Sequence, residues 1–156
     1  MIRRATEKDV EGIKNLLNQV LQVHADIRPD LFKANSRKYN DLELLQIIKN
    51  DQTPIFVYTN ENDDVVAHAF LEIRYNSETN NMYASKELYI DDLCVEKSLK
   101  GKHIGSILFE YVKQYASLIK CDFITLNVWE GNLSAMNFYK HKGLKPRKHC
   151  LEMKLD

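Results

Sequence analysis

A turn rich in lysine and glycine, Lys100–Ser106, is the part of the sequence best suited to bind an anion. It separates a β-rich stretch from a helical one, so backbone N–H groups at the helix start would lack partners inside the helix. These are the amides of Lys102, His103, Ile104 and Gly105. Gly101 and Gly105 allow close approach to the backbone, while the helix dipole and nearby lysines add positive potential. The turn therefore suits a pyrophosphate, although a solvated turn that only caps the helix has the same pattern.

Two adjacent acids, Asp91 and Asp92, lie where the alternation of a predicted strand breaks. In the segment 87–95, apolar residues fall at even positions as far as Ile90 and at odd positions from Leu93 onward. A β-bulge at the two aspartates would supply the one extra residue that restores the phase, and it would leave backbone groups unpaired, as bulges beside active sites do. The alternative is that the strand simply ends at Ile90.

The surrounding elements predict an α/β domain on a mixed sheet. Helical spacing predicts helices over 7–23, 41–50, 104–119 and 132–141, with Asp41 as the cap of the second and Gly143 closing the fourth. β-rich runs predict strands over 2–5, 54–59, 65–75, 87–95 and 123–128, and one or two more over 144–155. The strand, helix and strand over 87–128 imply parallel pairing through a right-handed crossover. The segment 24–39 is expected to be a loop with a short helical turn.

Composition limits the class of protein. The 156 residues are 44% hydrophobic and carry a formal charge of 0, which suits one domain over 1–156 and gives no field toward nucleic acid or an anionic membrane. Three cysteines without C-x-x-C spacing, Cys94, Cys121 and Cys150, predict reduced and mostly buried thiols rather than disulfides. The spacing of His141, His149 and Cys150 does not fit a metal site. A cytoplasmic location is expected, because neither a signal peptide nor a membrane span is evident.

Two motifs in order resemble one family. Lys100-Gly101-Lys102-His103-Ile104-Gly105 resembles motif A of the GCN5-related N-acetyltransferases (GNAT), Arg/Gln-x-x-Gly-x-Gly/Ala, with His103 where glycine is usual and Lys100 where arginine or glutamine is usual. Asn132-x-x-Ala135-x-x-Phe138-Tyr139-x-x-x-Gly143-Leu144 is similar to motif B, with leucine in place of the last aromatic residue. The motifs span about 89–144, and the order of elements extends the resemblance over nearly the whole chain.

The resemblance implies a GNAT-like single-domain fold: a mixed, mostly antiparallel sheet with helices on both faces and a parallel strand pair splayed at a bulge. Acetyl-coenzyme A would place its pyrophosphate on the Lys100–Ser106 turn and its pantetheine arm between the splayed strands. The hydroxyl of Tyr139 would return a proton to the coenzyme thiolate. Asn132 would orient the pantetheine amide, cap the helix, or do both. A freed backbone N–H around Cys94 or Val95 would meet the oxyanion.

The chemistry needs a base, because an alkyl amine with a pKa of ~10.4 is protonated at neutral pH. Asp91 is the first candidate, followed by Asp92 and Glu72; the alternative is that these acids only cap strands or attract a cationic substrate. We therefore predict an N-acetyltransferase in which a bound primary amine, on a small amine, a polyamine or a protein, attacks acetyl-coenzyme A directly. A buried thiol is expected at Cys94 rather than an acyl-enzyme.

Two other interpretations remain open. One is a sensor module of the same fold that binds acyl-coenzyme A without turnover, and the other is a structural domain with a coincidental glycine-lysine turn. The expected partners are acetyl-coenzyme A and an amine acceptor, with no nucleic acid, membrane or metal. A homodimer is possible.

Overall fold

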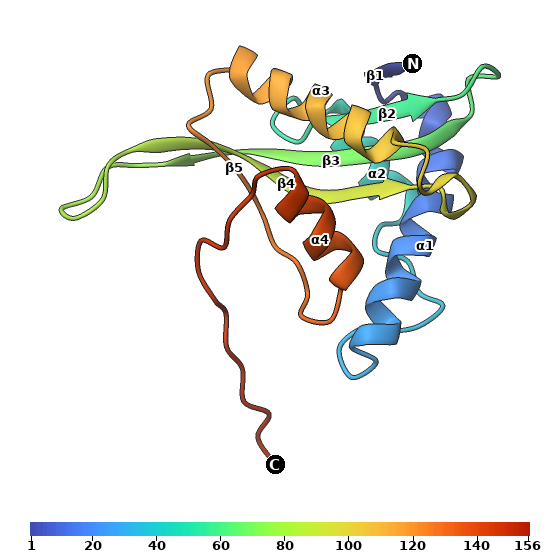
Figure 1. Ribbon diagram of the computed structural model, residues 1–156. Coiled ribbons are helices and arrows are strands. Elements are labelled where there is room, and N and C mark those ends of the chain that lie inside the picture. The colour runs from blue at the N-terminus through green and yellow to red at the C-terminus, as the bar shows by residue number, and fades with distance from the viewer.

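A five-stranded mixed sheet organises the protein in the computed structural model, which describes residues 1–156 (Figure 1). The strands lie in sequence order and comprise β1 (Ile2–Arg4), β2 (Ile55–Thr59), β3 (Val65–Asn76), β4 (Ser85–Val95) and β5 (Phe123–Leu126). β1 to β4 are antiparallel, whereas β4 and β5 are parallel. The helices are α1 (Val10–Ile27), α2 (Asp41–Lys49), α3 (Ile104–Leu118) and α4 (Leu133–His141), with short 3-10 turns η1 (Glu7–Asp9) and η2 (Lys97–Leu99). The predicted α/β fold with one parallel pair is confirmed.

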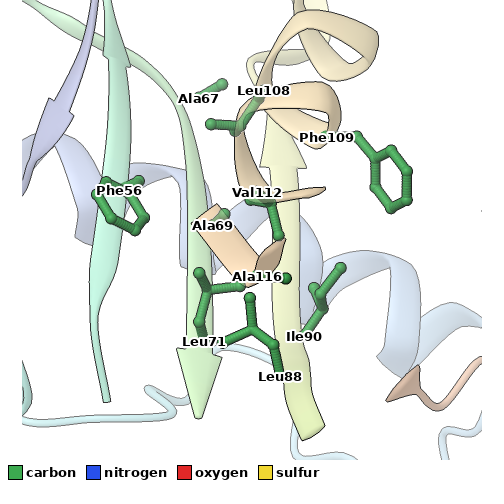
Figure 2. Packing of buried hydrophobic residues seen from close by; sticks show 10 residues of the cluster. All are labelled: Phe56, Ala67, Ala69, Leu71, Leu88, Ile90, Leu108, Phe109, Val112 and Ala116. Atoms are coloured by element: carbon green, nitrogen blue, oxygen red, sulfur yellow. The ribbon is translucent and has the colours of Figure 1, made fainter. Parts of the chain in front are cut away.

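Helices cover both faces of the sheet because successive strand residues point to opposite sides. On one face, the apolar stripe of α3 packs on β2, β3 and β4, as Figure 2 shows. This cluster comprises Phe56, Ala67, Ala69, Leu71, Leu88, Ile90, Leu108, Phe109, Val112 and Ala116. On the other face, α1 and α2 pack on a second cluster: Ala5, Ile13, Leu17, Leu44, Ile48, Ile55, Val57 and Phe70. The two clusters fix the positions of β3 and β4 between them.

Two helix boundaries differ from the prediction. The first helix begins with the 3-10 turn η1 under a capping box between Thr6 and Asp9, and α1 then continues to Ile27 instead of ending at 23. Its last turns are held because Ala25 is buried. The second helix is capped by Asn40 and not by Asp41: Asn40 accepts from the amide of Glu43 at 2.8 Å, and the Glu43 carboxylate accepts from the amide of Asn40 at 2.8 Å.

The predicted bulge is present in β4. Phe70 of β3 pairs with Asp92 and Leu71 pairs with Ile90, so Asp91 is the extra residue. Pairing between β4 and β5 ends at the same point, with Ile90 opposite Leu126. β5 is therefore two residues shorter than predicted, and the parallel strands no longer bond to each other beyond the bulge.

The strands predicted over 144–155 are wrong for this structure. α4 ends as expected at a Gly143 with a φ of 90°, and the amide of Leu144 donates to the carbonyl of Tyr139 at 3.1 Å. From there the chain runs on without helix or strand, and it extends away from the sheet (Figure 1). The alternation of Leu151, Met153 and Leu155 indicated an extended backbone, but no neighbouring strand lies within reach to pair with it.

Candidate active site

The turn before α3 presents a set of unpaired amides. Gly101 and His103 both have positive φ angles, 84° and 61°, which turn the backbone sharply into the helix. The amide of Lys102 is already used, because it donates to the carbonyl of Leu99 at 3.3 Å. The remaining amides have no acceptor in the protein: those of Gly101, His103, Ile104, Gly105 and Ser106. Four consecutive free donors at a helix start are a physically sound anion site.

The start of α3 lies close to the end of β4 and to α4. A Cβ added at Gly105 would lie 3.4 Å from Val95 and 3.6 Å from the ring of Phe138. Gly105 therefore allows the free amides to approach the point where β4 and β5 separate. Asn132 is the N-cap of α4, and its Oδ1 accepts from the amide of Ala135 at 3.2 Å, which agrees with the capping role among those predicted for it.

The backbone at the end of β4 offers one further donor to the opening between the strands. The amide of Glu96 donates to the carbonyl of Val66 at 2.8 Å, on the β3 side. Since N–H groups alternate along a strand, the amide of Cys94 also faces β3, and the amide of Val95 faces the side that β5 has left. Of the two residues predicted to supply an oxyanion donor, the geometry favours Val95.

The thiol of Cys94 is unsuited to nucleophilic chemistry. It is buried, its Sγ lies 3.7 Å from the carbonyl oxygen of Leu16, and burial raises its pKa to about 12. A thiol with such a pKa is protonated at neutral pH. The expectation of mostly buried cysteines holds for Cys94 but is wrong for Cys150, which is exposed, and Cys121 is intermediate.

The two bulge aspartates have different partners. Asp92 hydrogen-bonds through Oδ2 to Nε2 of His68, a side chain with no exposed surface that packs edge-on against Phe70. Nδ1 of His68 is buried without a hydrogen-bond partner. Sequence reasoning missed His68, although its position in phase with Val66 and Phe70 placed it on the inward face of its strand.

Asp91 pairs instead with Lys38, from the segment between α1 and α2, at 2.8 Å. Burial lowers the pKa of Lys38, but the hydrogen bond and charge of Asp91 outweigh burial, so the net pKa is raised. The ammonium group also lies 5.3 Å from the ring centre of Tyr39. Lys38 was not identified from the sequence. Glu72, the third acid considered, forms an ion pair with Arg74 at 2.8 Å.

Tyr139 of α4 lies close to Asp92 and Cys94. Its ring packs against Phe109 and Phe138, and burial raises the pKa of its hydroxyl, with further upward contributions from Asp92 and Cys94. The hydroxyl is therefore protonated at neutral pH, and it makes no hydrogen bond within the protein. The charge of Asp92 also contributes to the raised pKa of Lys38, so Asp92 lies near both Tyr139 and Lys38.

Three aromatic rings form a row, and the first of them, His24, lies near enough to Asp92 for that charge to act on its pKa. His24 lies 5.1 Å from the ring of Phe32, which in turn lies 5.3 Å from Trp129. Burial lowers the pKa of His24, so its ring is neutral at neutral pH. Arg28 lies 5.9 Å from the ring centre of Trp129. His24 and Arg28 belong to the segment 24–39 that was expected to be a loop, but they lie in the last turn of α1 and directly after it.

The structure contains no cluster of metal-ligating side chains and no helix that is long and apolar enough to cross a bilayer.

Comparison with known proteins identifies a family and a set of similar folds. The sequence model described as the acetyltransferase (GNAT) family matches residues 20–144. Among solved structures, a mutant of the protein BH1408 from Bacillus halodurans superposes with a TM-score of 0.95 at 28% identity, covering 99% of both chains. The aminoglycoside N-acetyltransferase AAC(6')-Iy, solved in complex with CoA, has a TM-score of 0.71 at 15% identity, covering 100% of this chain and 99% of that one.

A third structure is an aminoglycoside acetyltransferase from an uncultured soil metagenomic sample, with a TM-score of 0.73 at 15% identity, covering 100% of this chain and 95% of that one. At 15% identity, the last two comparisons show only that the folds are similar. The family model, however, covers most of the chain and spans both the free amides before α3 and Tyr139 on α4. The chain therefore belongs to the GNAT family of acetyltransferases.

Proposed function

We propose that this protein is an acetyl-coenzyme A-dependent N-acetyltransferase in which a bound primary amine attacks the thioester directly. The observation that carries the proposal is the separation of β4 from β5 beyond the bulge, where pairing ends at Ile90 and Leu126. The free amides before α3, the bulge acids and Tyr139 are arranged around that separation. Each group supplies something that acetyl transfer requires.

The donor would bind along the separated strands. The free amides of Gly101 and His103–Ser106 suit its pyrophosphate, and Lys100 and Lys102 add local positive charge. Its pantetheine arm would lie between β4 and β5, where the unpaired backbone of Val95 can hydrogen-bond to an extended amide chain. This placement puts the thioester beside the bulge.

We assign the base to Asp92, because Asp91 is paired with the cationic side chain of Lys38, whereas the partner of Asp92 is the imidazole of His68. His68 holds the Asp92 carboxylate in place, and Asp92 removes a proton from the ammonium group of the acceptor. The amine nitrogen then forms a bond to the carbonyl carbon, while the amide of Val95 stabilises the oxyanion by about 3 kcal/mol. The carbon–sulfur bond breaks, and Tyr139 donates its proton to the departing thiolate. The attacking nitrogen then loses its excess proton, which leaves the neutral amide and restores the tyrosine hydroxyl.

Release of free thiol from acetyl-coenzyme A tests the proposal over a panel of acceptors: alkyl amines, polyamines, aminoglycosides, and peptides with a free lysine or N-terminus. We expect release that depends on one class of amine, together with a rise in melting temperature on adding acetyl-coenzyme A. A ligand at about 100 times its dissociation constant adds about 2.7 kcal/mol of stability. A rise without turnover for any amine would support the sensor interpretation, and no rise would contradict donor binding altogether.

A further inference from the structure

Lys38 is the one lysine whose ammonium group pairs with an acid of the bulge. Its Nζ lies 2.8 Å from Oδ2 of Asp91, the extra residue of β4. Other lysines pair with acids elsewhere on the protein, such as Asp63, Glu7 and Glu110. Lys38 therefore brings a primary alkyl amine, the acceptor group of the proposed reaction, to the point where β4 and β5 separate.

The amine of Lys38 also lies near the proposed base. The charge of Asp92 contributes to the raised pKa of Lys38, and the same charge acts on the hydroxyl of Tyr139. Asp92 bonds to His68, which shares a face of β3 with Phe70, a residue of the cluster beneath α1 and α2. Both bulge acids therefore reach groups on the face that α1 and α2 cover.

The residues that follow Lys38 hold it at this position. Tyr39 stacks on Phe70, with ring centres 6.0 Å apart and an angle of 11° between the planes, and it packs against the same cluster. Asn40 is the N-cap of α2. An amine that is held beside the reacting centre reacts faster than a free amine, because no encounter in solution is needed.

The ion pair leaves the side chain of Lys38 free to move. The side chains of Lys38 and Asp91 are 43% and 36% exposed, and an ion pair of this exposure is weak because water screens both charges. The ammonium group can therefore leave Asp91 while the backbone stays in place. Away from that hydrogen bond, partial burial lowers the pKa of Lys38 against less opposition, which favours the neutral amine that attacks a thioester.

We propose that the protein acetylates its own Lys38 from acetyl-coenzyme A, in its own active site and within one chain. This inference rests on the proposed function, because it uses the same donor, base and acid. Asp92 takes a proton from the Lys38 ammonium, Nζ bonds to the carbonyl carbon, and the carbon–sulfur bond breaks as Tyr139 protonates the thiolate. Nζ then returns its excess proton to Tyr139, which leaves a neutral acetamide, free coenzyme A and one proton released to water.

The reaction should stop after one acetyl group per chain. The lone pair of an amide nitrogen is delocalised into the carbonyl, so the product does not attack a second thioester. Acetylation also removes the positive charge of Lys38. Asp91 then has no cationic partner within the chain, and its carboxylate becomes open to a cationic acceptor.

Mass spectrometry of the chain incubated with acetyl-coenzyme A alone tests the proposal. We expect one acetyl group per chain, mapped by peptide digestion to Lys38, and one equivalent of free coenzyme A by chromatography. Lys33, exposed in the same segment, is the internal control and should react at least about 100-fold more slowly, because nothing positions it. Lys38→Arg, which keeps a charge beside Asp91, should abolish the modification, and Lys33→Arg should leave it unchanged.

Two further samples test whether the reaction uses the active site of the same chain. Tyr139→Phe should slow acetylation of Lys38 at least about 100-fold and should lack any acetyl group added to Lys38 during expression. Asp92→Asn serves as a second variant if Tyr139→Phe lowers the melting temperature. In a mixture of Tyr139→Phe and Lys38→Arg chains, Lys38 should react no faster than in Tyr139→Phe alone.

The results that would overturn the proposal are distinct. Equal rates at Lys38 and Lys33, or a Lys38 rate that survives both Tyr139→Phe and Asp92→Asn, would mean ordinary chemical reactivity. A wild-type rate in the mixture would mean transfer between chains. An unmodified Lys38 would also overturn it. Turnover of an amine from the acceptor panel would then leave the proposed function standing, whereas no turnover and no rise in melting temperature would overturn both.

Discussion

Residues 1–118 and residues 119–156 are held together in different ways. All 27 buried residues belong to the first region, where α3 and the α1–α2 pair close over the sheet from both sides. The second region carries Tyr139 and Asn132 but packs mainly through half-buried aromatic contacts, such as Phe138 against Phe109. The first region supports the bulge acids with a buried core, and the second places groups of the site on α4, which contains no buried residue.

Truncation of one leucine in each region should give the largest difference in the free energy of unfolding. Leu108→Ala removes a fully buried side chain from α3 and should lower the free energy of unfolding by about 2–5 kcal/mol. Leu133→Ala on α4, where the side chain is 71% exposed, should change it by less than about 0.5 kcal/mol. Denaturant unfolding of both variants measures the difference. Equal losses would mean that α4 is packed as tightly as α3.

The second-largest difference should be in how much one ion pair from each region contributes to the free energy of unfolding. Asp9 is buried and accepts from Arg3 at 2.7 and 2.9 Å, whereas Glu152 is exposed beside Arg28. Asp9→Asn should cost about 2 kcal/mol at neutral pH, because it removes charged hydrogen bonds. Glu152→Gln should cost less than about 0.5 kcal/mol. Denaturant unfolding at neutral pH compares the two variants.

The cost of Asp9→Asn should depend on pH. Burial raises the pKa of Asp9, but the hydrogen bonds from Arg3 and Thr6 outweigh burial and leave it below the usual 3.8. A depressed folded-state pKa stabilises the protein above the unfolded value, and this stability is lost as the pH falls. The wild type and Asp9→Asn should therefore converge below about pH 4. A difference that is constant from pH 7 to pH 3 would contradict the assignment of this stability to the ionised pair.

The smallest expected effects concern two residues that flank α3 and have a left-handed backbone conformation. His103 and Lys120 have φ angles of 61° and 58°, and a side chain in that conformation costs about 1 kcal/mol. His103→Gly and Lys120→Gly should each stabilise the protein by about 0.5–1 kcal/mol. We expect Lys120→Gly to leave the acetyl-coenzyme A dissociation constant unchanged. Calorimetric titration shows whether His103→Gly tightens it, as expected if the imidazole crowds the free amides. A weaker constant would mean that His103 contributes a contact.

Features set by neighbouring residues were predictable from the sequence. The phase break at Asp91 and Asp92 gave the bulge because strand alternation is local, and Gly143 ended α4 for an equally local reason. The pairs His68–Asp92 and Lys38–Asp91 were missed because they join residues 24 and 53 positions apart. Such contacts depend on strand register and on the path of the α1–α2 segment, which local patterns do not encode.

The segment 144–155 was misjudged for a related reason. Its alternation correctly indicated an extended backbone, but a strand also needs a neighbour, and the pattern of one segment does not contain that neighbour. The cap of α2 was placed one residue late because Asn40 and Asp41 are both good caps, and only the geometry with Glu43 distinguishes them.

The steady-state kinetics of Tyr139→Phe, beside the matched variant Tyr115→Phe, test the account most directly. Both tyrosines pack edge-on against phenylalanines, but Tyr115 of α3 lies against Phe56 of β2 and takes no part in the proposed chemistry. We predict that Tyr139→Phe lowers kcat at least about 100-fold with little change in KM for acetyl-coenzyme A, and that Tyr115→Phe keeps wild-type values. A Tyr139→Phe enzyme with wild-type kcat would contradict the proposal that acetyl transfer takes place where β4 and β5 separate.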